Sequence, residues 1–294
     1  PVVEAEVFAS VPDRLRKKGQ PASWIDANHP GSGIDCFLEG PAFDRAGNLY
    51  MVDIPFGRIL RMSPKGEFDV AAEYDGWPNG LAIHKDGRVF IADYKHGIMV
   101  LDPKTGKVEP WLTHCFSESF KGVNDLTFAL NGDLYFTDQG QTGSHDPTGR
   151  VYRVSTDGRI DCLINNGNSP NGIVLDPQDK VLFVAMTRAN CMWHAPLKPG
   201  GGVAKVGVFA LLPGMHGPDG LAMDEAGNLL VAHRPNRLDG TFQDRQQHEH
   251  VVTLLISNGI GTHTIRHETD NSINITRLTG TDDRKIGPVP LDLF

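Results

Sequence analysis

The feature of this sequence that most constrains its fold is an internal repeat. A short apolar segment, a turn built on Gly, Asp or Asn, and a second apolar segment recur five times along the 294 residues. The five copies span 39–53, 78–93, 123–138, 170–185 and 218–233. Further apolar segments follow at 58–62, 97–101 and 150–154, with a weaker equivalent at 190–195. Each copy therefore predicts three or four short strands.

The spacing of the copies predicts the architecture. One polar residue heads each copy, at positions 39, 79, 124, 171 and 219, so the copies lie 40 to 48 residues apart. This period, without helical apolar spacing, is typical of a β-propeller. A sixth copy fits near residue 264, and residues 3–10 read as a lone strand that closes the last blade. We predict one all-β domain over 1–294, a six-bladed β-propeller with four-stranded blades, in which 235–294 form a divergent last blade.

Composition narrows the class of protein. The chain carries 28 Lys and Arg against 36 Asp and Glu, a formal net charge of −8, with no basic cluster. Such a chain is a poor match for nucleic acid or an anionic membrane surface. No apolar run is long enough to span a bilayer, and the first residues lack the order of a signal peptide. The four cysteines show no metal-binding spacing. We expect a cytoplasmic protein; the sequence does not indicate its oligomeric state.

The residues that head the copies are all carboxylates or carboxamides: Glu39, Asn79, Asn124, Asn171 and Asp219. In a propeller the innermost strands line a central channel, so these side chains are expected to converge at one mouth. Convergent carboxylate and amide oxygens are hard ligands for a divalent cation such as Ca²⁺, Mg²⁺ or Mn²⁺. Alternatively, Pro-Asn-Gly and Pro-Asp-Gly are simply turns. The turn interpretation suits Asn79, Asn171 and Asp219 better than it suits Glu39 and Asn124.

Four motifs in this order resemble one known family. They are Leu-Glu-Gly-Pro at 38–41, Val-Asn-Asp at 123–125, Ser-Pro-Asn-Gly at 169–172 and Gly-Pro-Asp-Gly at 217–220. Together they resemble the SMP-30/gluconolactonase/LRE family of six-bladed propeller lactonases, over roughly residues 36–234. Strings at 146–153 and 187–190 resemble its microbial sugar-lactonase branch. Residues 235–250 depart from the pattern of the microbial members.

The resemblance implies a set of roles. One divalent cation (Ca²⁺, Zn²⁺, Mg²⁺, Mn²⁺ or Fe²⁺) would be held by Glu39, Asn171 and Asp219, and Asn124 would contact the metal or the substrate. Asp219 would also be the general acid and base, and we assign Asn79 to substrate contact. The implied reaction is hydrolysis of a small-molecule lactone, such as gluconolactone or a related aldonolactone, to its hydroxy acid.

Sequence motifs for other kinds of catalytic or binding site are absent or weak. No G-x-S-x-G elbow and no phosphate-binding glycine pattern opens a helix. His216 and His233 flank the fifth copy and are minor candidates for the site. Residues 11–35 and 142–149 are predicted loops that cover one mouth and set substrate selectivity. The alternative function is a non-catalytic propeller that binds a metal or a protein partner.

Overall fold

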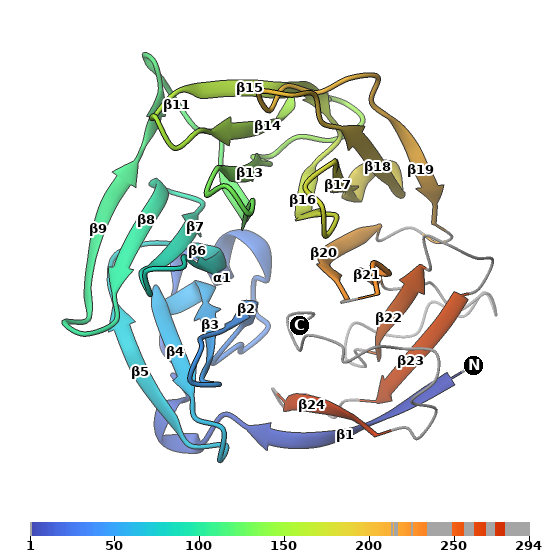
Figure 1. Cartoon of the computed structure of the whole chain (residues 1–294). Helices are drawn as coiled ribbons and strands as arrows, with labels where there is room; N and C mark the ends of the chain where they lie inside the picture. Colours follow the sequence, from blue (N-terminus) through green and yellow to red (C-terminus); the bar gives the residue numbers. More distant parts are fainter. Residues whose placement is uncertain are drawn as a thin grey trace.

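The fold consists of antiparallel sheets arranged around a common centre (Figure 1). The computed structural model describes residues 2–212, 214, 217–224, 226–233, 249–255, 262–268 and 274–279. Four sheets contain four strands each, and in each the first strand in the sequence lies innermost (Figure 1). We call these sheets blades one to four.

The blades follow one another along the chain. Blade one contains β2 (Leu38–Phe43), β3 (Leu49–Asp53), β4 (Arg58–Met62) and β5 (Phe68–Glu73). Blade two contains β6 (Pro78–Ile83), β7 (Val89–Asp93), β8 (Gly97–Asp102) and β9 (Lys107–Leu112). Blade three contains β12 (Val123–Phe128), β13 (Leu134–Asp138), β14 (Gly149–Val154) and β15 (Ile160–Gly167). Blade four contains β16 (Pro170–Leu175), β17 (Val181–Met186), β18 (Cys191–Pro196) and β19 (Gly207–Leu211).

A fifth sheet differs from the predicted blades. Its six strands are β20 (Pro218–Met223), β21 (Leu229–His233), β22 (Glu249–Leu255), β23 (Thr262–Glu268), β1 (Val2–Ser10) and β24 (Asn274–Thr279), in that order. β1 pairs antiparallel with β24 and parallel with β23, so both strands extend the fifth sheet. The propeller-like arrangement is confirmed, whereas six separate blades and the closing strand stay predictions. Most of 235–294, including the divergent 235–248, lies outside the described residues.

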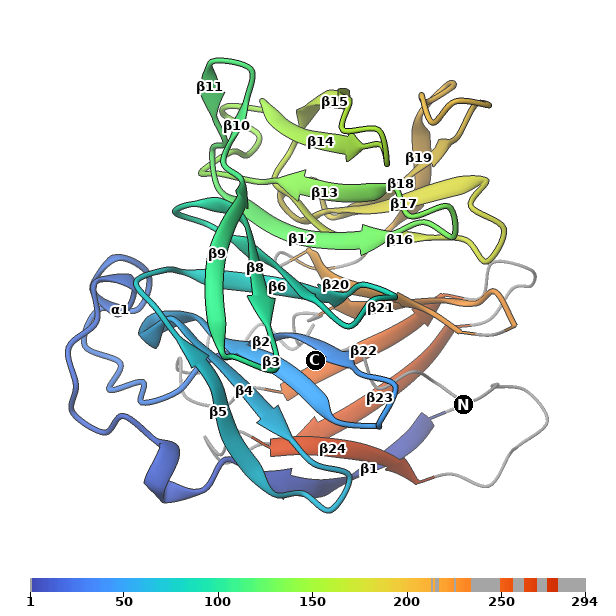
Figure 2. The same ribbon diagram turned by 60° about the vertical axis from the view of Figure 1, so that its left-hand side comes forward.

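The predicted loops contain short elements that periodicity alone did not show. A helix, α1 (Ser23–Asn28), and a 3₁₀ turn, η1 (Asp13–Leu15), lie within 11–35. Figure 2 shows α1 on one face of the ring. The remaining elements are a small hairpin, β10 (His114–Cys115) with β11 (Glu118–Ser119), and the 3₁₀ turns η2 (Ile54–Phe56) and η3 (Thr187–Ala189). Among the described residues, no helix has the length and apolar character needed to cross a membrane.

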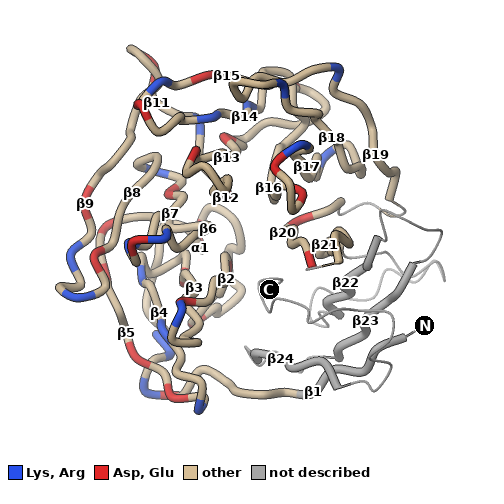
Figure 3. The backbone as a smooth tube through the Cα atoms, viewed as in Figure 1, with Lys and Arg blue, Asp and Glu red and all other residues tan. Residues whose placement is uncertain are grey.

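The second strand of each of the first three blades is the centre of its sheet. Every residue of β3, β7 and β13 is buried, because apolar side chains pack on both faces. The turns before these strands are fixed locally: Asp44 Oδ1 accepts hydrogen bonds from the backbone amides of Ala46 (2.8 Å) and Asn48 (2.9 Å). Charged residues of both signs are interspersed over the outer strands (Figure 3).

An irregularity recurs at one place in all five innermost strands. The pairing register shifts between Glu39 and Ala42 in blade one, and at the corresponding positions of β6, β12, β16 and β20. Such a bulge re-aims a side chain and increases local twist. Every bulge contains or adjoins the polar residue that heads its copy, so all five of these residues stand at equivalent places around the ring.

Neighbouring blades touch through backbone at these bulges. A Cβ on Gly172 would lie 2.4 Å from the Asp219 carbonyl oxygen, and one on Gly80 would lie 2.7 Å from the Asn124 carbonyl oxygen. Hydrogen bonds cross the same seams: Thr137 Oγ1 donates to the Asn171 carbonyl (2.8 Å). Glycine is needed here because any side chain would push two innermost strands apart.

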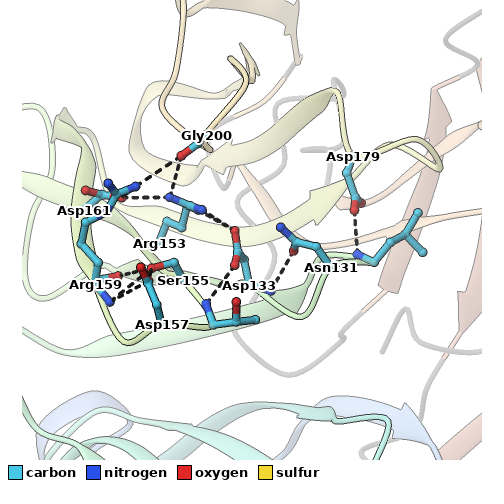
Figure 4. A network of polar contacts seen from close by, with 11 residues as sticks. Asn131, Asp133, Arg153, Ser155, Asp157, Arg159, Asp161, Asp179 and Gly200 are labelled. Atoms are coloured by element: carbon cyan, nitrogen blue, oxygen red, sulfur yellow. Dashed lines mark hydrogen bonds and ion pairs between the residues drawn. The ribbon is translucent and has the colours of Figure 1, made fainter.

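At the other end of the strands, an ionic network joins blades three and four (Figure 4). The buried Arg153 donates from Nε to Asp133 Oδ2 (2.7 Å), and from Nη1 to Asp161 Oδ2 (3.0 Å) and the Gly200 carbonyl (2.8 Å). Gly200 lies on the connection after β18, so one guanidinium links two blades. Its donors are matched by acceptors, as a buried cation requires.

The Gly172 contact gives a stability prediction. Gly172→Ala is expected to lower the free energy of unfolding by about 1–3 kcal/mol, because the added methyl group overpacks a backbone-to-backbone contact. Gly202→Ala is the matched control, since a Cβ at Gly202 meets nothing within 4 Å; its effect is expected to stay within about 0.5 kcal/mol. Thermal and urea unfolding followed by circular dichroism measure both. Equal stability of the two variants would contradict the close-packed seam.

Candidate metal and active site

The structure places the five predicted site residues at the starts of the five innermost strands. Glu39, Asn79 and Asn171 are half-buried, Asn124 is buried, and Asp219 is exposed to solvent. Their strands follow one another around the centre in the order β2, β6, β12, β16 and β20 (Figure 3). The bulges, rather than simple turns, therefore set the positions of these side chains.

Glu39, Asn171 and Asp219 interact across the ring. The Asn171 side chain hydrogen-bonds to the Asp219 carboxylate, and Glu39 feels the negative charge of Asp219. Burial among protein atoms, followed by repulsion from Asp219, raises the pKa of Glu39 well above its usual value. Reduced hydration also raises the pKa of Asp219, because protein atoms surround its carboxylate on several sides. The residue still reaches solvent. Two blades that are 180 residues apart in sequence thus share one electrostatic site.

A third carboxylate, Asp125, joins this site and was missed by the sequence analysis. Its Oδ1 accepts from the Leu126 amide (2.8 Å) and its Oδ2 from the Ile173 amide (3.0 Å) of blade four. Burial raises its pKa to about 7, with a further contribution from the charge of Asp219. A signal was present in the repeat: the residue after the head position is Gly in the other four copies and Asp only in this one.

Asn124 is held by a chain of side-chain hydrogen bonds. Its Nδ2 donates to Gln139 Oε1 (2.9 Å), and Gln139 Nε2 donates to Ser169 Oγ (2.9 Å). Thr142 Oγ1 in turn donates to the Gln139 carbonyl (2.6 Å) and accepts from the Ser169 amide (3.2 Å). Because this side-chain NH₂ group is engaged, the side-chain oxygen Oδ1 of Asn124 is the atom that a ligand would contact. Among the residues that the structure describes, no comparable chain of side-chain hydrogen bonds holds Asn79.

Arg188 supplies positive charge to the site and also was not assigned a role from sequence. It lies on η3, is exposed, and its charge lowers the pKa of Asp219 against the raising effect of burial. The predicted loop 142–149 reaches the same turn, because Ser144 Oγ donates to the Arg188 carbonyl (3.3 Å). This loop and 11–35 both connect strands on the side of the ring where the head residues stand. That they cover the mouth and set selectivity stays a prediction.

Other candidates have structural roles or lie outside the described residues. Asp53, Asp93 and Asp138 end the second strands of their blades, are fully buried, and accept hydrogen bonds from backbone amides. Asp53 and Asp138 hold the chain just before β2 and β12, and Asp93 holds the turn that follows β7. His233 occupies the equivalent buried place in β21, and His216 lies outside the described residues.

The donor set fits a hard divalent cation. Among the described residues, no three His, Cys, Asp or Glu side chains are close enough together to hold a metal ion. The predicted set instead pairs two carboxylates, Glu39 and Asp219, with amide oxygens, and such mixed oxygen shells suit Ca²⁺ or Mg²⁺. The raised pKa of Glu39 reflects in part the negative charge of Asp219 and Asp125, which a cation would offset.

Comparison with known proteins assigns the chain to a family. A family model described as "SMP-30/Gluconolactonase/LRE-like region" matches residues 37–261. This match covers well over half of the sequence and includes all five head residues. The chain belongs to the SMP-30/gluconolactonase/LRE-like family.

Two lactonases are similar to this chain in sequence. A lactonase drp35 of Staphylococcus aureus is 34% identical over 224 residues, which cover 71% of this chain and 66% of that protein. A lactonase drp35 of Staphylococcus epidermidis is 33% identical over 208 residues, which cover 66% of this chain and 62% of that protein. The chain thus spans slightly less than two thirds of the length of these relatives.

Two solved structures share the fold. A gluconolactonase from Xanthomonas campestris superposes with a TM-score of 0.65 at 18% identity, covering 92% of this chain and 95% of that one. Regucalcin from Agrobacterium tumefaciens, a calcium-binding protein, superposes with a TM-score of 0.59 at 19% identity, covering 89% and 79%. These likenesses agree with the propeller arrangement of the described sheets.

The repulsion between carboxylates predicts how the metal-free chain responds to substitution. Because the pKa of Glu39 is raised in the folded state, the stability gained from its protonated form is present at low pH and is lost as the pH rises through the folded-state pKa. In EDTA at pH 8, Asp219→Asn is therefore expected to melt about 2 °C or more above the unsubstituted protein. The difference is expected to shrink toward pH 5.

The control for this experiment is a carboxylate far from the site. Glu109 lies exposed on the outer strand β9, so Glu109→Gln is expected to leave the melting temperature in EDTA unchanged. A lower melting temperature for Asp219→Asn at every pH would show that Asp219 stabilises the metal-free fold, contrary to the repulsion described here.

Proposed function

We propose that this chain hydrolyses a lactone to its hydroxy acid at the site formed by Glu39, Asn171 and Asp219, with the help of one divalent cation. The observation that supports the proposal is the electrostatic interaction of these three residues, from blade one, blade four and the fifth sheet, with the pKa values of both carboxylates raised. The lactonases named among the relatives support the reaction class. Gluconolactone or a related aldonolactone is the proposed substrate.

Glu39, Asn171 and Asp219 would hold the cation, and the side-chain Oδ1 of Asn124 would contact either the cation or the substrate. When bound, a divalent cation polarises the lactone carbonyl, activates water and stabilises the negative charge that develops on the carbonyl oxygen. The amide ligands complete the oxygen shell without adding charge.

Asp219 would move the proton. As water attacks the carbonyl carbon, the Asp219 carboxylate accepts a proton from it, and then donates that proton to the ring oxygen as the C–O ring bond breaks. Reduced hydration raises the pKa of Asp219, whereas a bound cation would lower it and make the carboxylate a weaker base. We therefore expect the cation to supply most of the rate, with Asp219 contributing proximity and proton transfer. The product is a hydroxy acid, which loses its own proton to solvent.

Substrate orientation falls to residues around this centre. Asn79, on the neighbouring innermost strand of Glu39, is proposed to hydrogen-bond to the substrate. Arg188 is exposed on the same side and carries positive charge toward Asp219, so it is proposed to attract the carbonyl oxygen as it becomes negative. The buried hydrogen-bond chain through Gln139 keeps Asn124 oriented, which reduces the cost of ordering the site on binding.

Hydrolysis of glucono-1,5-lactone tests the proposal. Acid release at constant pH is expected with added Ca²⁺, Mg²⁺, Mn²⁺ or Zn²⁺, and is expected to fall to the uncatalysed rate in EDTA. Asp219→Asn is expected to lower kcat by about 100-fold or more, since the proton acceptor is lost while an oxygen ligand remains. Metal content and circular dichroism are measured on the same samples.

Asn79→Ala provides the contrasting variant. It is expected mainly to raise KM and to leave the metal content unchanged, because Asn79 contacts the substrate in this proposal. Loss of metal from Asn79→Ala would place Asn79 among the ligands instead. A panel of lactones that all remain intact while the protein still binds a cation would favour the non-catalytic propeller.

A further inference from the structure

We infer that a depression beside the candidate active site binds a neutral sugar ring, so that the preferred substrates are lactones of disaccharides rather than of single sugars. The inference rests on the proposed lactonase function and adds a substrate class to it. The depression has a volume of about 270 Å³ and lies between blades one and two and the segment 17–23. At about 30 Å³ per water molecule it holds roughly nine waters, which is room for one sugar-sized group.

The depression adjoins the proposed substrate-binding residue. Trp77 lines it, and Asn79 follows two residues later on β6. Two residues of extended chain span about 7 Å at most, so the two features are neighbours. The connection from β5 to β6 that carries Trp77 also lies on the side of the ring where the head residues stand. In the inferred complex, the lactone ring contacts Asn79 and the next ring of the substrate occupies the depression.

The charges in the depression cancel. Lys17 Nζ lies 3.2 Å from a Glu73 oxygen, and Lys95 Nζ lies 2.7 Å from an Asp75 oxygen. Two ammonium groups paired with two carboxylates leave no net field to attract an ion. An apolar ligand would have to strip water from four charged groups without replacing their hydrogen bonds. A neutral polyol can instead donate to the carboxylates and accept from the ammonium groups.

Aromatic side chains complete the lining. Phe56, Tyr74 and Trp77 are half-buried and form part of the wall. The exposed lining of the depression is mainly polar, which suits a ligand rich in hydroxyl groups, and the half-buried rings leave only a small apolar area for its C–H groups. Lys95 Nζ lies 5.2 Å from the centre of the Trp77 ring, so the aromatic and polar parts of the wall are in contact with each other.

The segment that closes the depression is held in place before any ligand arrives. The Lys17 amide donates to the Asp35 carbonyl (2.8 Å), and Arg16 forms an ion pair with Asp35 (2.8 Å). The buried Arg58 of blade one donates from Nη1 to the Leu15 carbonyl (2.7 Å). A wall anchored in this way lowers the ordering cost of binding.

The test compares three substrates. Initial rates are measured for glucono-1,5-lactone, cellobiono-1,5-lactone and maltobiono-1,5-lactone with the activating metal present. At least one disaccharide lactone is expected to show a kcat/KM about tenfold above that of gluconolactone. Trp77→Ala is expected to bring this ratio close to one, and Lys17→Ala, which changes a surface group and spares the core, is expected to lower it several-fold. Trp111→Ala, on the outer strand β9, is the control and is expected to keep the ratio.

Calorimetric binding of cellobiose and maltose separates the two proposals. Binding that is lost in Trp77→Ala and weakened in Lys17→Ala supports the sugar subsite even if no lactone is hydrolysed, in which case only the proposed reaction fails. Hydrolysis of gluconolactone with no preference for either disaccharide lactone, and no binding of either disaccharide, would overturn the subsite and leave the lactonase proposal standing.

Discussion

The close approach of neighbouring innermost strands at their bulges is the contact on which the rest of the structure depends. Gly40, Gly80 and Gly172 each face the backbone of the next innermost strand at distances that leave no room for a side chain. The same bulges aim Glu39, Asn124, Asn171 and Asp219 toward one region. Fold and site are thus two consequences of one repeated local geometry, and a change at a seam would disturb both.

The gathered carboxylates oppose folding in the absence of a ligand. Glu39, Asp125 and Asp219 come from blade one, blade three and the fifth sheet. Burial raises the pKa of each, and the charge of Asp219 raises the pKa values of Glu39 and Asp125 further. Two buried arginines elsewhere in the described chain are each matched by a carboxylate: Arg153 by Asp133, and Arg58 by Asp53. We interpret the carboxylate cluster at the ends of the innermost strands as functional, because the proposed cation would balance its charge.

Much of the fold was predictable because the repeat is long and regular. The third strands predicted at 58–62, 97–101 and 150–154 are observed as β4, β8 and β14 within one residue, since apolar periodicity and turn residues agree there. α1 escaped prediction because six residues are too few to show helical periodicity. The six-blade count, the single domain over 1–294 and the cytoplasmic location stay predictions.

The candidate site was predictable only where the repeat marked it. Glu39, Asn171 and Asp219 head their copies, and the structure brings them into one electrostatic site. Asp125 and Arg188 were missed because their roles depend on neighbours in other blades: Ile173 donates to Asp125, and Arg188 acts on Asp219. Contacts between distant segments are set by how the blades pack, which a single sequence does not state.

Anomalous diffraction from crystals grown with Mn²⁺ tests the central claim most directly, because it locates the cation without relying on activity. The account predicts one strong peak within coordination distance of oxygen atoms of Glu39, Asn171 and Asp219, and loss of that peak in Glu39→Gln crystals. A strong peak elsewhere in the chain, or an unchanged peak in Glu39→Gln, would contradict the shared site.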